Sequence, residues 1–184
     1  MNLKQLNISS YGEDVFISEN VEIRRPQLVN LGSHIAIDSG FYCTTALEMG
    51  DYIHIAPFTA IIGGAKAKLT MAHFTNISVG GRIVCGSDEF LGEGLITAPG
   101  IPEEYRDQLK IEEVRFEMFA NIGANVTILP GITLGEGSVV GACSLVTKDT
   151  EPWTIYIGTP AKPIKIRPRE KMIEYAKKMG YYSK

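Results

Sequence analysis

An apolar residue returns at every sixth position through the C-terminal half of the chain. Between residues 122 and 151 these positions are Ile122, Ile128, Leu134, Val140 and Val146. A helical face would return every three or four residues and a half-buried strand every two, so neither explains the spacing. The intervening glycines also disfavour helices and long strands. A strict six-residue period predicts a parallel β-solenoid of short strands and tight turns.

The same period can be followed towards the N-terminus. After a break that contains Pro26, it is kept by Leu31, Ile37, Cys43, Met49, Ile55 and Ile61, and after residues 63–68 by Met71 and Ile77. Positions four residues after these are mostly apolar too, so each hexad has two inward positions. The repeat therefore covers most of the chain, and Cys43 is predicted to be a core residue.

Two segments depart from the repeat. Residues 81–114 show no six-residue phase, and a loop of this length with so many apolar residues is expected to leave the solenoid and pack on something. After Pro168, apolar residues at helical spacing end near Gly180. We therefore expect a solenoid domain over residues 1–167 with an insertion at about 81–114, and a C-terminal helix over 168–184 that covers the open end of the solenoid.

Composition and charge narrow the class of protein. The 184 residues are 45% hydrophobic with a net charge of −3, and the segment from Lys162 onward carries +6, which leaves −9 for residues 1–161. An acidic body argues against nucleic-acid binding but permits a site for an anionic small molecule. Three cysteines without metal-like spacing, a polar first segment and no long apolar run predict a cytoplasmic protein with no metal and no membrane insertion.

The final part of the repeat resembles a known family. The segment EPWTIYIGTPAKPIKIR and more than ten hexads are similar to the hexapeptide-repeat acyltransferases over about residues 15–167. The resemblance implies an all-β, left-handed parallel β-helix and a homotrimer with active sites between subunits. It also implies transfer of an acyl group from acetyl-CoA or another short acyl-CoA to a hydroxyl or an amine.

A narrower resemblance concerns the acceptor. The segments ISVGGRIVCGSDEF, GEGL and IPEEYR are similar to nucleotide-sugar N-acyltransferases that modify amino-dideoxy sugars for surface polysaccharides such as lipopolysaccharide. This resemblance implies acylation of the amino group of a nucleotide-linked sugar, with dTDP as the expected nucleotide. Because one fold hosts many chemistries, a sugar or antibiotic O-acetyltransferase, a non-catalytic structural β-helix and a metal hydratase stay open.

Direct acyl transfer needs an acceptor atom about 3 Å from the thioester carbonyl and a proton acceptor nearby. Many family members use a histidine in or near the long loop, but residues 81–113 contain none. His73, just before the loop, is one catalytic candidate, with a solvated corner histidine as the alternative. His34, His54 and His73 have different offsets in their hexads, so a row of metal ligands is not expected.

Two carboxylates of the loop are the other catalytic candidates. Asp88 and Glu93 lie among glycines and apolar residues that would pack at a subunit junction, where a partly desolvated acid could accept a proton or hold an ammonium group. Ser78 could contact the sugar, and Arg82 or Arg106 could approach a diphosphate. The alternatives are solvated loop acids and a serine bonded to the backbone.

The resemblance also implies where coenzyme A would lie. The pantetheine arm would contact the main chain around Gly123, Ala124 and Ala142, and the phosphates would meet lysine side chains. The expected phosphate contacts are Lys148, Lys162 and Lys165; the expected turn beside the adenine is Gly158, Thr159 and Pro160. Tyr105, in a possible lid, is expected to contact the nucleotide, and Trp153 to pack at the last coil.

Overall fold

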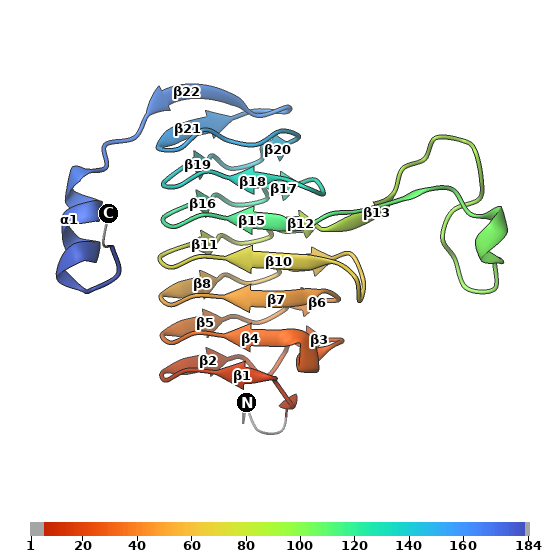
Figure 1. Cartoon of the computed structure of the whole chain (residues 1–184), viewed down its shortest axis with the longest axis horizontal. Helices are drawn as coiled ribbons and strands as arrows, with labels where there is room; N and C mark the ends of the chain where they lie inside the picture. Colours follow the sequence, from red (N-terminus) through yellow and green to blue (C-terminus); the bar gives the residue numbers. More distant parts are fainter. Residues whose placement is uncertain (1–5, 183–184) are drawn as a thin grey trace.

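The computed structural model describes residues 6–182, and over these residues the chain winds into a three-sided prism of parallel strands (Figure 1). The first sheet contains β1 (Ser10–Tyr11), β4 (Val29–Leu31), β7 (Ala46–Met49), β10 (Lys68–Met71), β15 (Val114–Phe116) and β18 (Thr133–Leu134). The second contains β2 (Val15–Ile17), β5 (Ile35–Ile37), β8 (Ile53–Ile55), β11 (Asn76–Ile77), β16 (Asn121–Ile122), β19 (Val139–Val140), β21 (Thr154–Ile157) and β22 (Lys162–Ile166). The third contains β3 (Glu22–Ile23), β6 (Tyr42–Cys43), β9 (Ala60–Ile62), β12 (Arg82–Val84), β17 (Thr127–Ile128) and β20 (Leu145–Val146).

The chain passes from the first sheet to the second, then to the third, and back to the first. We call the turns between these sheets the first corner (first to second), the second corner (second to third) and the third corner (third to first). Each corner recurs in every coil, so residues of one corner form a column that runs along the prism. These columns decide which side chains come together.

The six-residue period produces the core. The five apolar residues that mark the period between residues 122 and 151 are all buried, as are Cys43, Ile55 and Ile77 further upstream. In-register pairing stacks these side chains into inward rows, for example Ile55 on Ile77 and Ile77 on Ile122. The predicted β-solenoid is therefore confirmed, and the burial of Cys43 confirms its assignment to the core.

The insertion begins later than predicted. Ile83 lies six residues after Ile77, is fully buried, and belongs to β12, which pairs with both β9 and β17. The solenoid phase therefore continues through Val84. The inserted segment then leaves the third corner as an antiparallel hairpin of β13 (Gly86–Asp88) and β14 (Leu109–Ile111), with a short 3-10 turn η3 (Glu103–Tyr105) near its tip (Figure 1).

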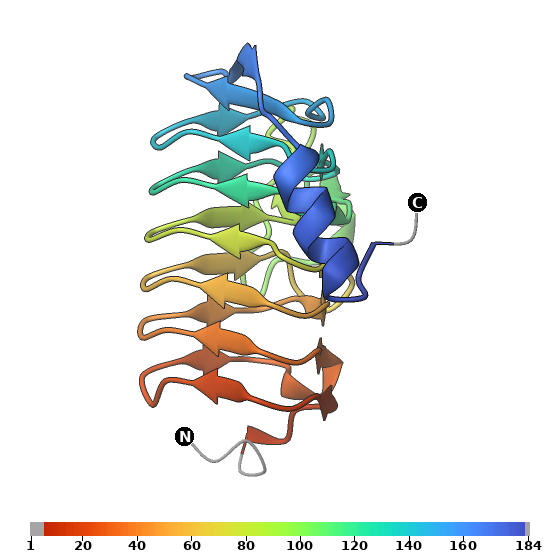
Figure 2. The ribbon, with the colours of Figure 1, turned by 90° about the vertical axis from the view of Figure 1, so that its left-hand side faces the viewer.

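The C-terminal helix is confirmed, but its predicted position is wrong. The open edge of β21 is covered by β22, which pairs with it in antiparallel fashion. The helix α1 (Glu170–Lys178) instead lies along the side of the prism, against the first corner (Figure 2). Its Ala176 is buried with Phe119 and Trp153, so Trp153 is a packing residue as predicted.

A second short 3-10 turn, η2 (Pro26–Leu28), lies at the early break in the repeat. Pro26 starts this turn, where its fixed φ suits the first helical position. None of the helices found among residues 6–182 has both the length and the apolar character that crossing a membrane would need.

Candidate functional site

Most of the residues expected to bind the cofactor come together along the second corner. The turns around Ala124, Ala142 and Thr159 follow one another there in successive coils. The amide of Cys143 donates to the carbonyl of Ala124 at 2.8 Å, and the hydroxyl of Thr159 donates to the carbonyl of Cys143 at 3.3 Å. The predicted turn at residues 158–160 is confirmed.

Ser78 belongs to the same column, one coil nearer the N-terminus. The amide of Asn125 donates to the carbonyl of Val79 at 2.9 Å, which ties the turn that follows Ser78 to the turn that follows Ala124. Sequence spacing alone did not show this, because the insertion separates the two turns. The hydroxyl that was predicted to contact the sugar thus lies in line with the predicted cofactor residues.

Small residues let the coils of this corner approach closely. A Cβ atom placed on Gly123 would lie 2.7 Å from the amide nitrogen of Ala142, so a larger residue at 123 would push the two coils apart. Ala142, Gly158 and Thr159 are exposed. A long, narrow ligand could therefore lie along this corner against the main chain.

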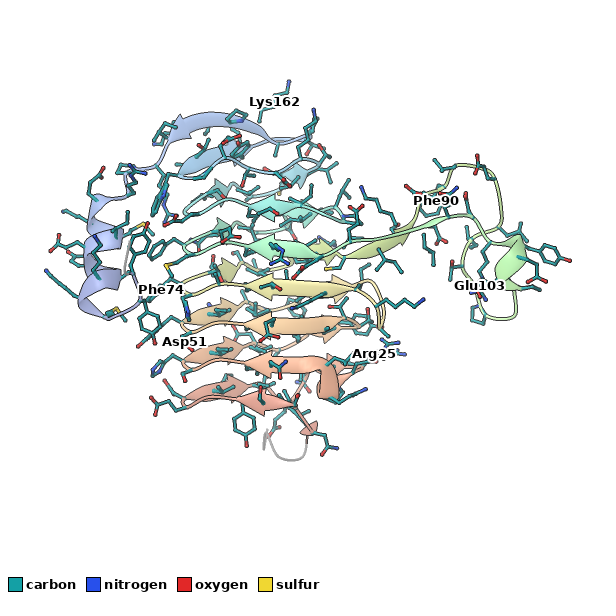
Figure 3. All side chains as sticks on the ribbon, in the orientation of Figure 1. Arg25, Asp51, Phe74, Phe90, Glu103 and Lys162 are labelled. Carbon is teal, nitrogen blue, oxygen red and sulfur yellow. The ribbon has the colours of Figure 1, made fainter. Side chains whose placement is uncertain are left out.

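The three predicted phosphate-binding lysines lie at different places. Lys162, at the start of β22, is exposed at the C-terminal end of the prism and pairs with Ile157, next to the second corner (Figure 3). Lys165 is further along the same strand, opposite Ile155. Lys148 lies at the third corner, so within one chain it is not part of the second-corner column.

His73 is also at a distance from this column. It lies at the first corner, where its Nδ1 accepts a hydrogen bond from the amide of Asp51 at 2.8 Å and its ring packs edge-on against Tyr181 at 4.9 Å. Asp51 itself is partly buried, which would raise its pKa, but hydrogen bonds from the Ser33 amide and the Tyr181 hydroxyl, with the nearby His73, hold the pKa below its ordinary value. These contacts hold His73 between the first corner and the C-terminal segment, away from the second-corner column.

Asp88 faces a hollow at the base of the hairpin. Its Oδ1 accepts a hydrogen bond from the main-chain amide of Thr97 at 3.0 Å, while its Oδ2 has no protein partner within residues 6–182. The hollow has a volume of about 280 Å³ and is also lined by Gly63, Leu109 and Ile111. The structure therefore fixes one carboxylate oxygen and leaves the other available to a ligand.

Glu93 has a more open environment than Asp88. Its side chain is exposed, and its Oε2 accepts a hydrogen bond of 3.4 Å from the side-chain amide of Gln108.

Tyr105 is exposed near the tip of the hairpin. Arg106 is turned inward, because its Nε donates to the carbonyl of Ile101 at 2.8 Å. Of the two arginines predicted to approach a diphosphate, Arg82 is the exposed one. It lies on the outer face of the third sheet, and one Nη donates to the carbonyl of Gly80 at 3.0 Å.

Sequence reasoning missed Asp107, the one charged side chain that is buried among the described residues, at 7% exposure. Its Oδ2 accepts from the amide of Gly92 at 3.0 Å and its Oδ1 from the amide of Gln108 at 2.8 Å. Its own amide donates to the carbonyl of Leu95 at 2.8 Å. Asp107 thus closes the loop that contains Thr97, and no motif or period in the sequence distinguishes it from the other loop acids.

The two halves of the predicted site do not meet within one chain. Ser78 and the predicted cofactor turns are at the second corner, whereas Asp88 is on a hairpin that leaves the third corner and projects away from the prism (Figure 1). Phe90, which is 69% exposed, lies on this projecting hairpin segment (Figure 3). A single chain therefore presents two separate surfaces, each carrying part of the predicted site.

Other features of the surface do not add to this site. A hollow of about 500 Å³ lies over the second sheet in the N-terminal coils, and none of the predicted site residues lines it. Within residues 6–182, no group of three or more His, Cys, Asp or Glu side chains is arranged to hold a metal ion.

Comparison with known proteins identifies relatives that extend over nearly the whole chain. No protein-family model matches. The dTDP-4-amino-4,6-dideoxy-D-glucose acyltransferase of Escherichia coli is 32% identical over 176 residues, which cover 92% of this chain and 88% of the relative. AntD, an N-acyltransferase from Bacillus cereus in complex with dTDP-4-amino-4,6-dideoxyglucose and coenzyme A, is 33% identical with a TM-score of 0.89, over 96% of this chain and 92% of AntD.

Further AntD structures agree with this result. AntD in complex with dTDP and 3-hydroxybutyryl-CoA is 34% identical with a TM-score of 0.88, over 97% of this chain and 95% of AntD. The AntD structures include variants at one serine and at an aspartate ten positions further along. The predicted left-handed β-helix is confirmed. The chain belongs to the family of dTDP-4-amino-4,6-dideoxyglucose acyltransferases, which are built on hexapeptide repeats.

Proposed function

We propose that this protein transfers an acyl group from a short acyl-CoA to the amino group of a dTDP-linked amino-dideoxy sugar. The observation that carries the proposal is the second-corner column, in which Ser78 is in line with the turns around Ala124, Ala142 and Thr159. The small residues of this column, of which Ala142, Gly158 and Thr159 are exposed, suit the pantetheine arm of an acyl-CoA. The ligands named for AntD, a dTDP-linked amino sugar and coenzyme A, support this assignment.

The spacing of two residues supports their role in the site. Ser78 and Asp88 are ten positions apart, the same separation as the serine and the aspartate varied in AntD. The Thr97 amide donates to Oδ1 of Asp88, and in our proposal the other oxygen, Oδ2, binds the amino group of the sugar. Ser78 contacts the sugar from the second corner, and Arg82 binds the diphosphate.

The chemistry requires no covalent enzyme intermediate. The neutral amine attacks the thioester carbonyl, a C–N bond forms, the C–S bond breaks, and coenzyme A leaves as a thiolate. The proton lost by nitrogen passes to the thiolate, directly or through Asp88. Asp88 therefore orients the amine and stabilises the positive charge that develops on nitrogen. Glu93 and His73 stay alternative candidates for the proton transfer.

We further propose that the active enzyme is a homotrimer in which the hairpin of one copy reaches the second corner of the next. Exposed apolar side chains of the hairpin support this, because a soluble monomer rarely leaves so many uncovered. They are Phe90, Leu91, Leu95, Ile96, Tyr105 and Leu109. This assembly would bring Asp88 to Ser78, and Lys148 of a neighbouring copy could approach the cofactor phosphates.

We place the enzyme in the cytoplasm, acting in the synthesis of a surface polysaccharide such as lipopolysaccharide. The acyl group could be acetyl or a larger chain such as 3-hydroxybutyryl, and the AntD complex supports the larger one. Assays with both acyl-CoAs would decide between them.

The test is thiol release from acyl-CoA in the presence of dTDP-4-amino-4,6-dideoxyglucose. We expect release with the amino sugar and none with its 4-hydroxyl analogue; release with the hydroxyl analogue would instead indicate an O-acyltransferase. Asp88→Asn should lower turnover at least about tenfold without changing the assembly. The matched control is Glu103→Gln, which changes an exposed acid of the same inserted segment and should behave as the wild type. Unchanged turnover in Asp88→Asn would remove Asp88 from the mechanism, and Glu93→Gln and His73→Asn would then be compared.

A further inference from the structure

The hollow over the second sheet in the N-terminal coils contains a slot between two rings. Outward side chains of this sheet stack in register, so that Phe16 pairs with Ala36 and Ala36 pairs with His54. Phe16 is 58% exposed and His54 is exposed as well, whereas Ala36 between them carries only a methyl group. All three line the hollow, whose volume is about 500 Å³. Ala36 is therefore the floor of a slot, with Phe16 and His54 as its walls.

The slot is wider than a flat ring needs. Neighbouring coils lie roughly 4.8 Å apart, so positions 16 and 54, two coils apart, are separated by about 10 Å along the prism. A flat aromatic ring in contact with carbon atoms on both sides would occupy about 7–8 Å of this distance. A saturated six-membered sugar ring is puckered and thicker. The spacing therefore suits a pyranose better than a planar ligand.

Carboxylates fix the two histidines that border the slot. Nε2 of His54 lies 2.8 Å from Oδ2 of Asp38, and Nδ1 of His34 lies 3.1 Å from Oδ2 of Asp14. The His34 ring also stacks on Tyr52, with the centroids 4.5 Å apart. Both imidazole rings are thus held in place before a ligand arrives, so binding costs less conformational entropy than it would with mobile side chains.

The slot also offers polar atoms that the protein does not use. Within residues 6–182, Nδ1 of His54, Nε2 of His34, Oδ1 of Asp14 and the side-chain amide of Asn76 have no hydrogen-bond partner in the protein. These atoms include donors and acceptors, which is what the hydroxyl groups of a sugar require. Among the described residues, no lysine or arginine lines the hollow, so its chemistry does not suit a phosphate.

We propose that this slot is a binding site for a neutral sugar in the pyranose form. The C–H face of the sugar ring packs on Phe16, the ring lies over Ala36, and its hydroxyl groups bond to Asp14, His34 and His54. The aromatic ring supplies the apolar contact and the polar atoms fix the orientation, which is the usual division of tasks in a small-molecule site.

The slot is separate from the proposed active site. The turns that contain Asp14, His34 and Tyr52 place the hollow towards the first corner, whereas Ser78 is at the second corner and Asp88 is on the hairpin that leaves the third. The inference therefore does not rest on the proposed function. A sugar bound in the slot would attach the protein to a glycan without taking part in acyl transfer.

The test is saturation-transfer NMR of the intact protein with three probes, the methyl pyranosides of glucose, galactose and mannose. We expect the wild type to transfer magnetisation to the ring protons of at least one probe. Phe16→Ala removes the stacking surface and should weaken binding roughly tenfold. Ala36→Phe fills the slot and should abolish the signal. The matched control is Phe58→Ala, which removes a ring that is 71% exposed at the second corner and should bind as the wild type.

Activity and Tm show whether the variants are intact. Ala36→Phe should keep the wild-type Tm and the wild-type KM for acyl-CoA and for the nucleotide sugar, because its side chain lies on another face of the prism. If Ala36→Phe lowers Tm, the binding of Phe16→Ala decides the question.

Four results would overturn the inference. They are no saturation transfer from the wild type to any of the three probes, equal binding by wild type and both slot variants, displacement of the probe by dTDP-4-amino-4,6-dideoxyglucose, and binding of choline in place of the pyranosides. Displacement would place the sugar in the active site, and choline binding would make the slot a cation site. The proposed function stands or falls separately, on thiol release.

Discussion

The first and second corners of the prism have similar backbone conformations but differ in their side chains, which are mostly aromatic at one and mostly small at the other. Both place a residue with positive φ in successive coils. At the first corner several of these residues are large rings, and Tyr52, Phe74 and Phe119 stack with centroids 5.1 and 5.5 Å apart beneath α1 and Tyr181. At the second corner most are small, as at Gly80, and the column is open.

This contrast shows how one repeat can support two different tasks. The hexad period fixes the path of the backbone, but the side chain at each left-handed position decides whether a corner is packed or accessible. The aromatic column binds the C-terminal segment of the same chain. The small-residue column leaves the main chain exposed, where we propose that acyl-CoA binds. Changes at equivalent positions of the two corners should therefore have different consequences.

The largest expected effect is on stability at the first corner. Phe119→Ala removes a ring that is 3% exposed and contacts Trp153, so it should lower the free energy of unfolding by about 3–5 kcal/mol. The free energy would be measured by urea unfolding. Phe58→Ala, at the equivalent place on the second corner, is the control and should change it by less than about 1 kcal/mol. Equal losses at both corners would contradict the distinction.

At the second corner the expected effect is on ligand binding. Ala142→Phe places a ring on the proposed acyl-CoA path, so the KM for acyl-CoA should rise at least about tenfold while Tm and dTDP affinity stay unchanged. The matched control is Ala65→Phe, at an exposed position of the third corner. A normal KM in Ala142→Phe would show that acyl-CoA does not follow this column.

A smaller effect is expected from Asp107, which acts on Asp88 through the loop. Asparagine has one acceptor oxygen where aspartate has two, so Asp107→Asn leaves either the Gly92 or the Gln108 amide without its hydrogen-bond acceptor. The loop that presents the Thr97 amide to Asp88 should then be held less firmly. We expect kcat to fall severalfold, with dTDP and acyl-CoA affinities unchanged. The kinetic constants would be compared with those of Glu104→Gln, an exposed acid nearby. A loss confined to Tm, with normal kcat, would limit Asp107 to a structural role.

The smallest effect concerns the contact between the C-terminal segment and the first corner. The hydrogen bond to Asp51 raises the pKa of Tyr181 to about 12 from an ordinary value of 10.0. The stability that this bond contributes is complete below pH 10 and is lost as pH rises towards 12. The depressed pKa of Asp51 makes its contribution disappear in acid, below an ordinary value of 3.8. Tyr181→Phe should therefore lower Tm slightly at neutral pH and flatten the alkaline part of the Tm profile; an identical profile would exclude this contact.

The regular part of the molecule could be predicted because its cause is local. Apolar residues six apart have one consistent explanation, and Ile122, Ile128 and Leu134 lie where the period requires. The start of the insertion was misjudged because Cys85 and Gly86 follow Ile83 without a visible boundary in the sequence. The position of α1 could not be predicted, since its apolar face fits the aromatic column as well as an open end.

The site was less accessible to sequence reasoning. Ser78 and Ala124 come together only because the third-corner insertion leaves the coil phase intact, which spacing does not reveal. Asp107 resembles any solvated loop acid until its two N–H partners are seen. Lys148 shows the converse, because residue type suggested a phosphate contact and the coil geometry places it at another corner.

The central claim is that the second corner of one copy and the hairpin of another form one active site. Ala142→Phe and Asp88→Asn damage opposite halves of that site, so at acyl-CoA concentrations below the wild-type KM each variant alone should have at most about a tenth of the wild-type activity. Subunits of the two variants, unfolded together and reassembled, should recover about a quarter of the wild-type sites, because some neighbours then combine two intact halves. Activity of the mixture that does not exceed the sum of the separate variants would contradict the claim.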